Sequence, residues 1–287
     1  MAAVSETARR AVVAGRFYPG GAKDLRDQAT AFLAAQPQAP ARFAREDVLA
    51  VMLPHAGYPF SGAVAGATLG QIDVPDRLIL LGPNHTGRGA PLSVWGGGGW
   101  ESPLGLMPLD MAARELFLAH GTGFVPDRAA HEGEHSLEVL VPFFQVRNPE
   151  ARILPIAVGN VPLPVLETAG AVLAEVASAA VSAGERILLV VSSDMSHFLP
   201  HAAAVEADAV ALDALETLDP EVFFTVVRGK GISMCGVFPM TLALFALARL
   251  GAAKAFRIAY ATSGQTGRAF GADMNRVVGY AGVVFTR

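Results

Sequence analysis

The chain has 287 residues, of which 52% are hydrophobic and 17% are charged, and its formal net charge is −4. This apolar fraction is enough to bury a large core and excludes a disordered chain, while the acidic balance and the lack of a basic run argue against nucleic acid as the main partner. The single cysteine excludes an internal disulfide and favours a reducing compartment, so we expect a cytoplasmic protein.

Two apolar segments, 161–183 and 237–250, raise the question of a membrane span. Glu167 and Glu175 interrupt the first segment, and the second is shorter than the roughly 20 residues that a span requires. Residues 1–10 hold no apolar run of signal-peptide length ahead of their arginines. We therefore expect no membrane partner.

Runs rich in β-branched residues or leucine alternate along the chain with alanine-rich segments. The runs predicted to form buried strands are 48–53, 77–81, 153–158, 187–191, 256–261 and 277–285. The segments predicted to form helices are 22–35, 62–71, 110–119, 136–144, 163–182, 202–215 and 237–250, and the Pro-rich stretch 36–41 is predicted to join the first helix to the first central strand. Continuous apolar runs are typical of strands covered on both faces. The pattern therefore predicts one α/β domain over residues 1–287, a layered sandwich with a central, mostly parallel or mixed sheet flanked by helices.

Histidines stand just beyond three of the predicted strands. His55 follows the strand 48–53, His85 follows 77–81, and His197 follows 187–191. A single histidine in such a place is as often a core or capping residue as a functional one. Ligands of open α/β sheets bind outside the carboxyl ends of the strands, so three such histidines are predicted to converge on one crevice.

Cys235 precedes the apolar helix predicted at 237–250. A thiol at a helix N-terminus feels the positive end of the helix dipole, which is expected to lower its pKa and favour the thiolate. A thiolate is both a nucleophile and a soft metal ligand. The alternative is a small buried hydrophobic residue, which is the commonest role of a lone cysteine.

Residues 131–135 match the H-E-x-x-H pattern of zinc proteases. That pattern requires both histidines on one continuous helix, whereas Gly133 interrupts the segment and no apolar helical stripe precedes it. We predict instead that a helix begins near Glu134, which places His135 and Glu138 on neighbouring positions close to its N-terminus.

Taken in order, the motifs of the chain resemble those of the Memo family, which includes the bacterial and archaeal proteins called AmmeMemoRadiSam system protein B. The motifs that carry the resemblance are AGRFYP at 14–19, PHAGY at 54–58 with SG at 61–62, GPNH at 82–85, SPLG at 102–105, EHSLE at 134–138 with PF at 142–143, SSDMSH at 192–197, CG at 235–236, SG at 263–264 and VGY at 278–280. Together they cover nearly the whole chain.

The Memo family is similar in fold to the class III extradiol dioxygenases, which hold a non-haem Fe(II) with two histidines and a carboxylate and use a separate histidine as acid and base. By position, the resemblance implies that His55 and His85 are metal ligands and that His197 is the catalytic histidine. Cys235 stands where the dioxygenases have glutamate. A thiolate softens the site, so the expected metal is Fe(II), with copper or zinc as alternatives, and ring cleavage is in doubt.

Two further residues are candidates for the same pocket. Asp194, three residues before His197, is expected to orient that histidine or to support the metal ligands, and His135 is expected to line the pocket. The predicted catalytic residues are therefore His197, Asp194 and His135.

Four functions follow from this set of residues. The first is an oxygen-dependent oxidoreductase that acts on a small molecule. The second is a non-catalytic protein that binds a metal, a peptide or another partner in the same cleft. The third is a partner subunit of a radical-SAM-linked system, as the family name implies. The fourth is a metal-free thiol enzyme with Cys235 as nucleophile and His197 as base, which leaves His55 and His85 without roles. The apolar composition is also compatible with a homo-oligomer.

Overall fold

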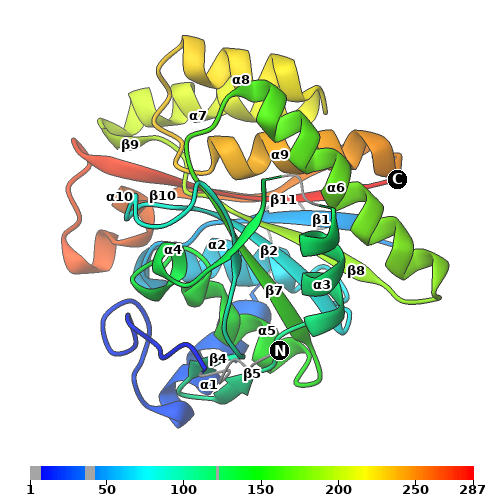
Figure 1. Cartoon of the computed structure of the whole chain (residues 1–287). Coiled ribbons are helices and arrows are strands. Elements are labelled where there is room, and N and C mark those ends of the chain that lie inside the picture. The colour runs from blue at the N-terminus through cyan, green and yellow to red at the C-terminus, as the bar shows by residue number, and fades with distance from the viewer. Residues whose placement is uncertain (1–7, 36–42, 121–122) are drawn as a thin grey trace.

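The computed structural model describes residues 8–35, 43–120 and 123–287 (Figure 1). The strands are β1 (Val48–Leu53), β2 (Arg77–Pro83), β3 (Leu92–Trp95), β4 (Trp100–Ser102), β5 (Gly105–Met107), β6 (Val125–Asp127), β7 (Arg152–Val158), β8 (Ile187–Ser192), β9 (His197–Leu199), β10 (Lys254–Thr262) and β11 (Val277–Thr286). The helices are α1 (Ala22–Leu33), α2 (Tyr58–Leu69), α3 (Met111–Ala119), α4 (Ala129–Glu132), α5 (Val141–Arg147), α6 (Leu163–Ser182), α7 (His201–Glu216), α8 (Pro220–Gly229), α9 (Val237–Leu250) and α10 (Ser263–Thr266), with 3₁₀ turns η1 (Glu138–Leu140) and η2 (Arg268–Phe270). The Pro-rich stretch 36–41 lies outside the described residues.

One mixed sheet runs through the centre of the molecule. Its strand order is β10-β11-β1-β8-β2-β7-β3-β6, and β9 adds to β11. Strands β1, β8, β2 and β7 are parallel to one another, whereas β11 is antiparallel to both β1 and β10. Helices α6 to α9 cover one face, and α1, α2 and α5 lie on the other (Figure 1). The predicted α/β fold class is therefore confirmed.

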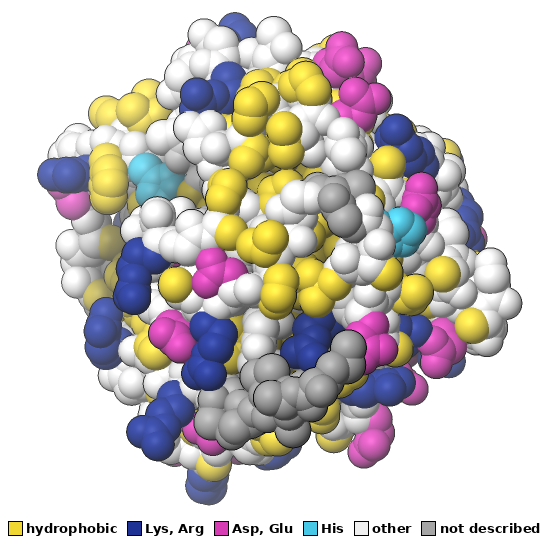
Figure 2. Space-filling view, in the orientation of Figure 1, with side chains coloured by type: hydrophobic (Ala, Val, Ile, Leu, Met, Phe, Trp, Pro, Cys, Tyr) yellow, Lys and Arg dark blue, Asp and Glu magenta, His cyan; other side chains and the backbone are white. Residues whose placement is uncertain are grey.

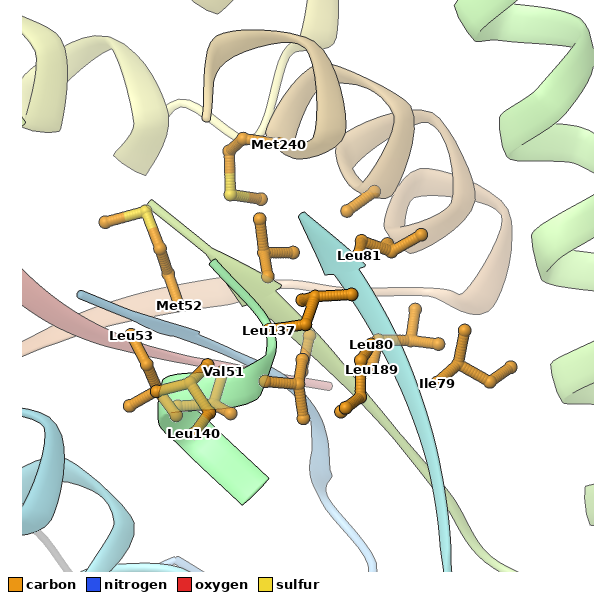
Figure 3. Packing of buried hydrophobic residues seen from close by; sticks show 14 of the residues in the cluster. Val51, Met52, Leu53, Ile79, Leu80, Leu81, Leu137, Leu140, Leu189 and Met240 are labelled. Atoms are coloured by element: carbon orange, nitrogen blue, oxygen red, sulfur yellow. The ribbon is translucent and has the colours of Figure 1, made fainter. Parts of the chain in front are cut away.

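The central strands are buried on both faces, as their continuous apolar sequences predict. Figure 3 shows Met240 of α9 packed on one face of the sheet, while Leu137 and Leu140 pack on the other. The latter two side chains belong to the segment that follows His135. The hydrophobic core therefore anchors this segment directly beneath the ends of the strands.

The predicted helix at 136–144 is wrong in its bounds. The chain makes the turn η1 and then α5, which begins at Val141 with Pro142 in its first turn. Proline lacks a backbone N–H and suits the start of a helix better than its interior. Strands β3 and β6 and helix α8 were not predicted either, and the two strands have only four and three residues.

Among the described residues, α6 alone has the length and apolar composition of a membrane span, and half of that apolar window is buried inside the protein. Gly170 lets this helix approach α9 closely, since a Cβ there would lie 2.5 Å from Cβ of Phe245. The buried half of this helix packs inside the α/β fold.

The α6–α9 contact generates a stability prediction. Gly170→Ala is expected to lower the free energy of unfolding by about 1–3 kcal/mol, because the added methyl group overlaps α9. Gly229→Ala is the matched control, because a Cβ at this last residue of α8 meets no atom within 4 Å. It is expected to be neutral or to stabilise by up to about 1 kcal/mol. Urea unfolding measures both changes, and equal effects would contradict the packing described.

Candidate metal centre

Three histidines from distant parts of the chain meet at one edge of the sheet. His55 follows β1 and His85 follows β2, and these parallel strands end at the same edge. His135 comes from the loop between α4 and η1. One nitrogen of each ring lies within 4.8 Å of the others. The rings of His85 and His135 are stacked with centroids 4.9 Å apart, and that of His55 stands edge-on to both.

The hydrogen bonds of His55 determine which of its nitrogens is free. Its Nδ1 lies 2.7 Å from Oγ of Ser192, and that hydroxyl donates its proton to the carbonyl of Ser136 at 2.6 Å. Since a serine hydroxyl has one proton, Ser192 must accept from Nδ1–H of His55. The lone pair of His55 is therefore on Nε2, the nitrogen that faces Cys235.

The hydrogen bonds of Glu134 determine which nitrogen of His85 is free. Its Oε1 lies 2.9 Å from Nδ1 of His85 and its Oε2 accepts from the backbone N–H of His85, while Oε1 also accepts from the N–H groups of His135 and Ser136. Burial alone would raise the pKa of Glu134, but the hydrogen bond and charge of His85 and the N–H of Ser136 lower it to about 2. An ionised carboxylate only accepts hydrogen bonds, so Nδ1 of His85 carries the proton and Nε2 is free.

Burial keeps two of these imidazoles neutral. The pKa of His55 is held well below its usual value by burial and then by the neighbouring His85 and His135. Burial also lowers the pKa of His135, and the charge of Glu134 opposes this only in part. Neutral imidazole is the form that binds a metal ion.

Cys235 lies beside His55, just before α9. Its Sγ is 3.4 Å from Nε2 of His55 and accepts from the backbone N–H of Asp194 at 3.2 Å. Gly236 permits this approach, because a Cβ at that position would overlap Ser193. The expected lowering of the thiol pKa is wrong: burial and then the charge of Asp194 raise it. The dipole of one helix stabilises a thiolate by less than the free energy that it costs to bury an unpaired thiolate.

Asp194 contacts His55, whereas His197 acts on His55 and Asp194 only through its charge. The carboxylate of Asp194 accepts from the backbone N–H of His55 at 2.8 Å. Burial raises the pKa of Asp194 to about 6, although the N–H groups of His55 and Ala56 work against this. His197 is more exposed, and its Nδ1 lies 2.9 Å from the carbonyl of Ser233. The proton on Nδ1 is therefore engaged, and Nε2 of His197 is its free acceptor.

The structure thus brings His55, His85 and His135 together, while Cys235 contacts His55 and is not part of this group of mutually close ligand atoms. Asp194 is in contact with His55 and Cys235. It adds His135 to the candidate ligands, for which the sequence suggested only a lining role. The roles of these residues stay predictions. Sequence reasoning missed Glu134 and Ser192 as partners of the imidazoles, although EHSLE and SSDMSH contain them.

His131 does not join the cluster. It is buried between Trp95 and Trp100, and its Nε2 lies 2.9 Å from Oγ of Ser93. Helix α4 ends at Glu132, so the two histidines of the H-E-x-x-H match do not share a helix. The arrangement is that of a packed core histidine and not that of a zinc protease.

Arg9 holds the loop that carries His135 and Glu134. Its guanidinium donates to the carbonyl groups of His131 and Glu134 and to the carboxylate of Glu138, at 2.8, 2.5 and 2.6 Å. The Arg9–Glu138 pair is buried, with side-chain exposures of 1% and 2%. Glu138 also accepts from the hydroxyl of Tyr18 at 2.8 Å. One arginine therefore fixes both ends of the segment that positions two of the imidazoles.

Comparison with known proteins gives a family match over nearly the whole chain. The family model described as Memo-like protein matches residues 9–284. The chain is 37% identical over 278 residues to a MEMO1 family protein of Aquifex aeolicus, covering 96% of this chain and 98% of the relative. It is 34% identical over 273 residues to a MEMO1 family protein of Archaeoglobus fulgidus, covering 95% and 97%.

The Arg9 clamp generates a prediction about metal affinity. Arg9→Met is expected to weaken zinc binding by about 10–100-fold, because the groups that orient the ligands lose their support. Arg77→Met is the control, since Arg77 forms a buried pair with Asp110 at the opposite edge of the sheet. Removing one partner of either pair is expected to cost about 3–5 kcal/mol of stability.

Zinc titration and urea unfolding separate the two effects. Arg9→Lys serves as a milder variant, because lysine keeps the charge but lacks the planar guanidinium fork whose nitrogens reach three separate acceptors. Equal losses of zinc affinity in the Arg9 and Arg77 variants would show that the clamp acts only on stability.

The burial of His131 generates a pH prediction. Burial lowers its pKa from 6.5 to about 4, so between these values the unfolded chain binds more protons than the folded one. Stability is then complete above pH 6.5 and is lost as the pH falls to 4, by about 3 kcal/mol. His131→Gln is expected to remove this part of the pH dependence. Urea unfolding across this range measures it, and identical slopes for both proteins would contradict the assignment.

Proposed function

The chain belongs to the Memo family, and from this membership and the site geometry we propose that it is a metal-dependent oxidoreductase that uses O2 on a small molecule. The ligands we propose are His55, His85 and Cys235, with His135 placed to add a third imidazole. Fe(II) is the proposed metal, and copper and zinc are the alternatives that the same soft donor set would accept. The observation that carries the proposal is that ligand nitrogens of His55, His85 and His135 lie within 4.8 Å of one another, with Sγ of Cys235 3.4 Å from Nε2 of His55.

The donor set fits a metal ion in three respects. The outer nitrogens of His55 and His85 are held by Ser192 and Glu134, so both rings present a lone pair inward. The buried imidazole of His55 stays neutral. The thiol of Cys235 is buried next to the carboxylate of Asp194 and holds its proton in the absence of a cation. Metal binding would release that proton, so metal affinity is expected to rise with pH.

The residues around the ligands would then handle protons. A bound Fe(II) would supply a redox-active centre with positions open to O2 and a chelating substrate. His197 is half-exposed and has Nε2 free, so it can take a proton from a substrate hydroxyl and return it later. Asp194 links this histidine to the ligands through its charge and its contact with His55. Cysteine in place of a carboxylate changes the donor set, and we therefore do not propose ring cleavage.

Metal analysis of protein purified without oxygen tests the ligands. The wild type is expected to hold one Fe(II) per chain, and His55→Ala, His85→Ala and Cys235→Ala are each expected to abolish binding, because a site of few donors does not tolerate the loss of one. His120→Ala is the matched control, since His120 ends α3 and pairs with Glu175. Full iron occupancy in the triple His55/His85/Cys235 alanine variant would refute the site.

Oxygen uptake across a panel of catechols and other enediols tests the reaction. Uptake that depends on iron and falls in His197→Gln would support the oxidoreductase. Tight metal binding without uptake for any compound would favour one of the two non-catalytic functions, a binding protein or a partner subunit of a radical-SAM-linked system.

A further inference from the structure

A cavity of about 490 Å³ lies in the segment between β10 and β11. Among the described residues, its lining consists of Gly264, Gln265, Arg268, Ala272 and Met274, all from this segment. Strand β10 is parallel to β1, because both are antiparallel to β11. The cavity therefore opens at the same edge of the sheet as His55.

The walls of the cavity are held in place by packing. A Cβ on Gly264 would lie 2.5 Å from Sδ of Met274, and one on Gly267 would lie 2.7 Å from the ring of Phe60 in α2. The backbone carbonyl of Met274 accepts from the N–H of His201 at 2.8 Å. The segment thus lies against two helices, and the cavity is a built feature of the fold.

A short chain of contacts joins the cavity to the centre. Ser263 is next to Gly264 of the cavity wall, and its Oγ accepts a hydrogen bond from the backbone N–H of Val278 at 2.9 Å. Val278 is paired in the sheet with His197. Val278 of β11 therefore lies between His197, its partner on β9, and Ser263 at the border of the cavity.

The cavity has a cationic and apolar character. Arg268 is its one charged lining residue, and in the described part of the chain its guanidinium has no hydrogen-bond or ion-pair partner. Asp273, the acid of this segment, uses Oδ1 to accept from the N–H of Asn275 and does not line the cavity. Figure 2 shows basic and hydrophobic side chains side by side along the left margin, where Figure 1 places this segment.

Large apolar side chains are exposed on this segment and on β9, the strand that pairs with β11. Phe270 is 69% exposed, Met274 43% and Phe198 61%. Phe198 has a left-handed backbone with φ of 61°, and Arg276 lies over its ring at 4.7 Å. A bulky residue seldom adopts this conformation, and such strain is concentrated at functional sites. The left-handed backbone of Phe198 leaves its ring exposed to solvent next to His197.

We propose that this cavity binds an anionic small molecule with an apolar body, such as an aromatic carboxylate, with Arg268 as its counter-ion and Met274 as its apolar wall. The inference rests on the proposed function in taking this ligand to be the substrate of the adjacent centre. Binding in the cavity itself does not require the metal.

Methyl NMR of protein labelled at the methionine methyl groups tests the proposal on the metal-free chain. The probes are benzoate and 2-naphthoate, with benzamide and 2-naphthamide as neutral analogues of the same shape. The two acids are expected to shift the Met274 signal, which Met274→Leu identifies, and the amides are not. Arg268→Gln is expected to weaken binding of the acids by about tenfold, as loss of a charge-assisted hydrogen bond does.

Arg26→Gln is the control, because Arg26 is an exposed arginine on α1 and the charge change is the same. It is expected to bind the acids as the wild type does. The proposal is overturned if neither acid shifts the Met274 signal up to its solubility limit, if the amides bind equally well, or if Arg268→Gln has no effect. Iron binding by Arg268→Gln is measured in parallel, so failure of the cavity and failure of the metal site are distinguished.

Discussion

The centre depends on the hydrogen bonds that hold the outer nitrogen of each imidazole. Ser192 takes the Nδ1 proton of His55 and Glu134 takes that of His85, which leaves the inner nitrogens as acceptors. The carboxylate of Glu134 in turn accepts hydrogen bonds from backbone N–H groups. Arg9 donates to the backbone carbonyl of Glu134 and to the carboxylate of Glu138. Residues far apart in the chain, from Arg9 to Ser192, therefore determine where the Nε2 lone pairs of His55 and His85 point.

The electrostatics of the centre suit a cation. Burial disfavours charge on His55, on Cys235 and on Asp194 alike, which lowers the pKa of the imidazole and raises those of the two acids. A bound divalent ion would instead favour the charged forms of Cys235 and Asp194, because its positive charge stabilises thiolate and carboxylate. The imidazole of His55 and the thiol of Cys235 are thus uncharged before a metal enters, and the proton that the thiol gives up links metal binding to pH.

Much of the fold could be predicted because buried parallel strands have continuous apolar sequences, and β1, β2, β7 and β8 do. The placement of His55 and His85 follows from the shared edge of such strands. The helix predicted at 136–144 failed because Glu138 turns inward to meet Arg9 and Pro142 sets the start of α5. Nothing local in the sequence indicates a contact between residues so far apart, and the pKa of Cys235 could not be predicted without its burial.

X-ray absorption spectroscopy at the iron edge of the Fe(II)-loaded protein tests the central claim most directly, because it identifies the atoms bound to the metal. We expect one sulfur and at least two imidazole nitrogens around the iron, with the sulfur lost in Cys235→Ser. A spectrum with oxygen and nitrogen neighbours only, unchanged by that substitution, would contradict it.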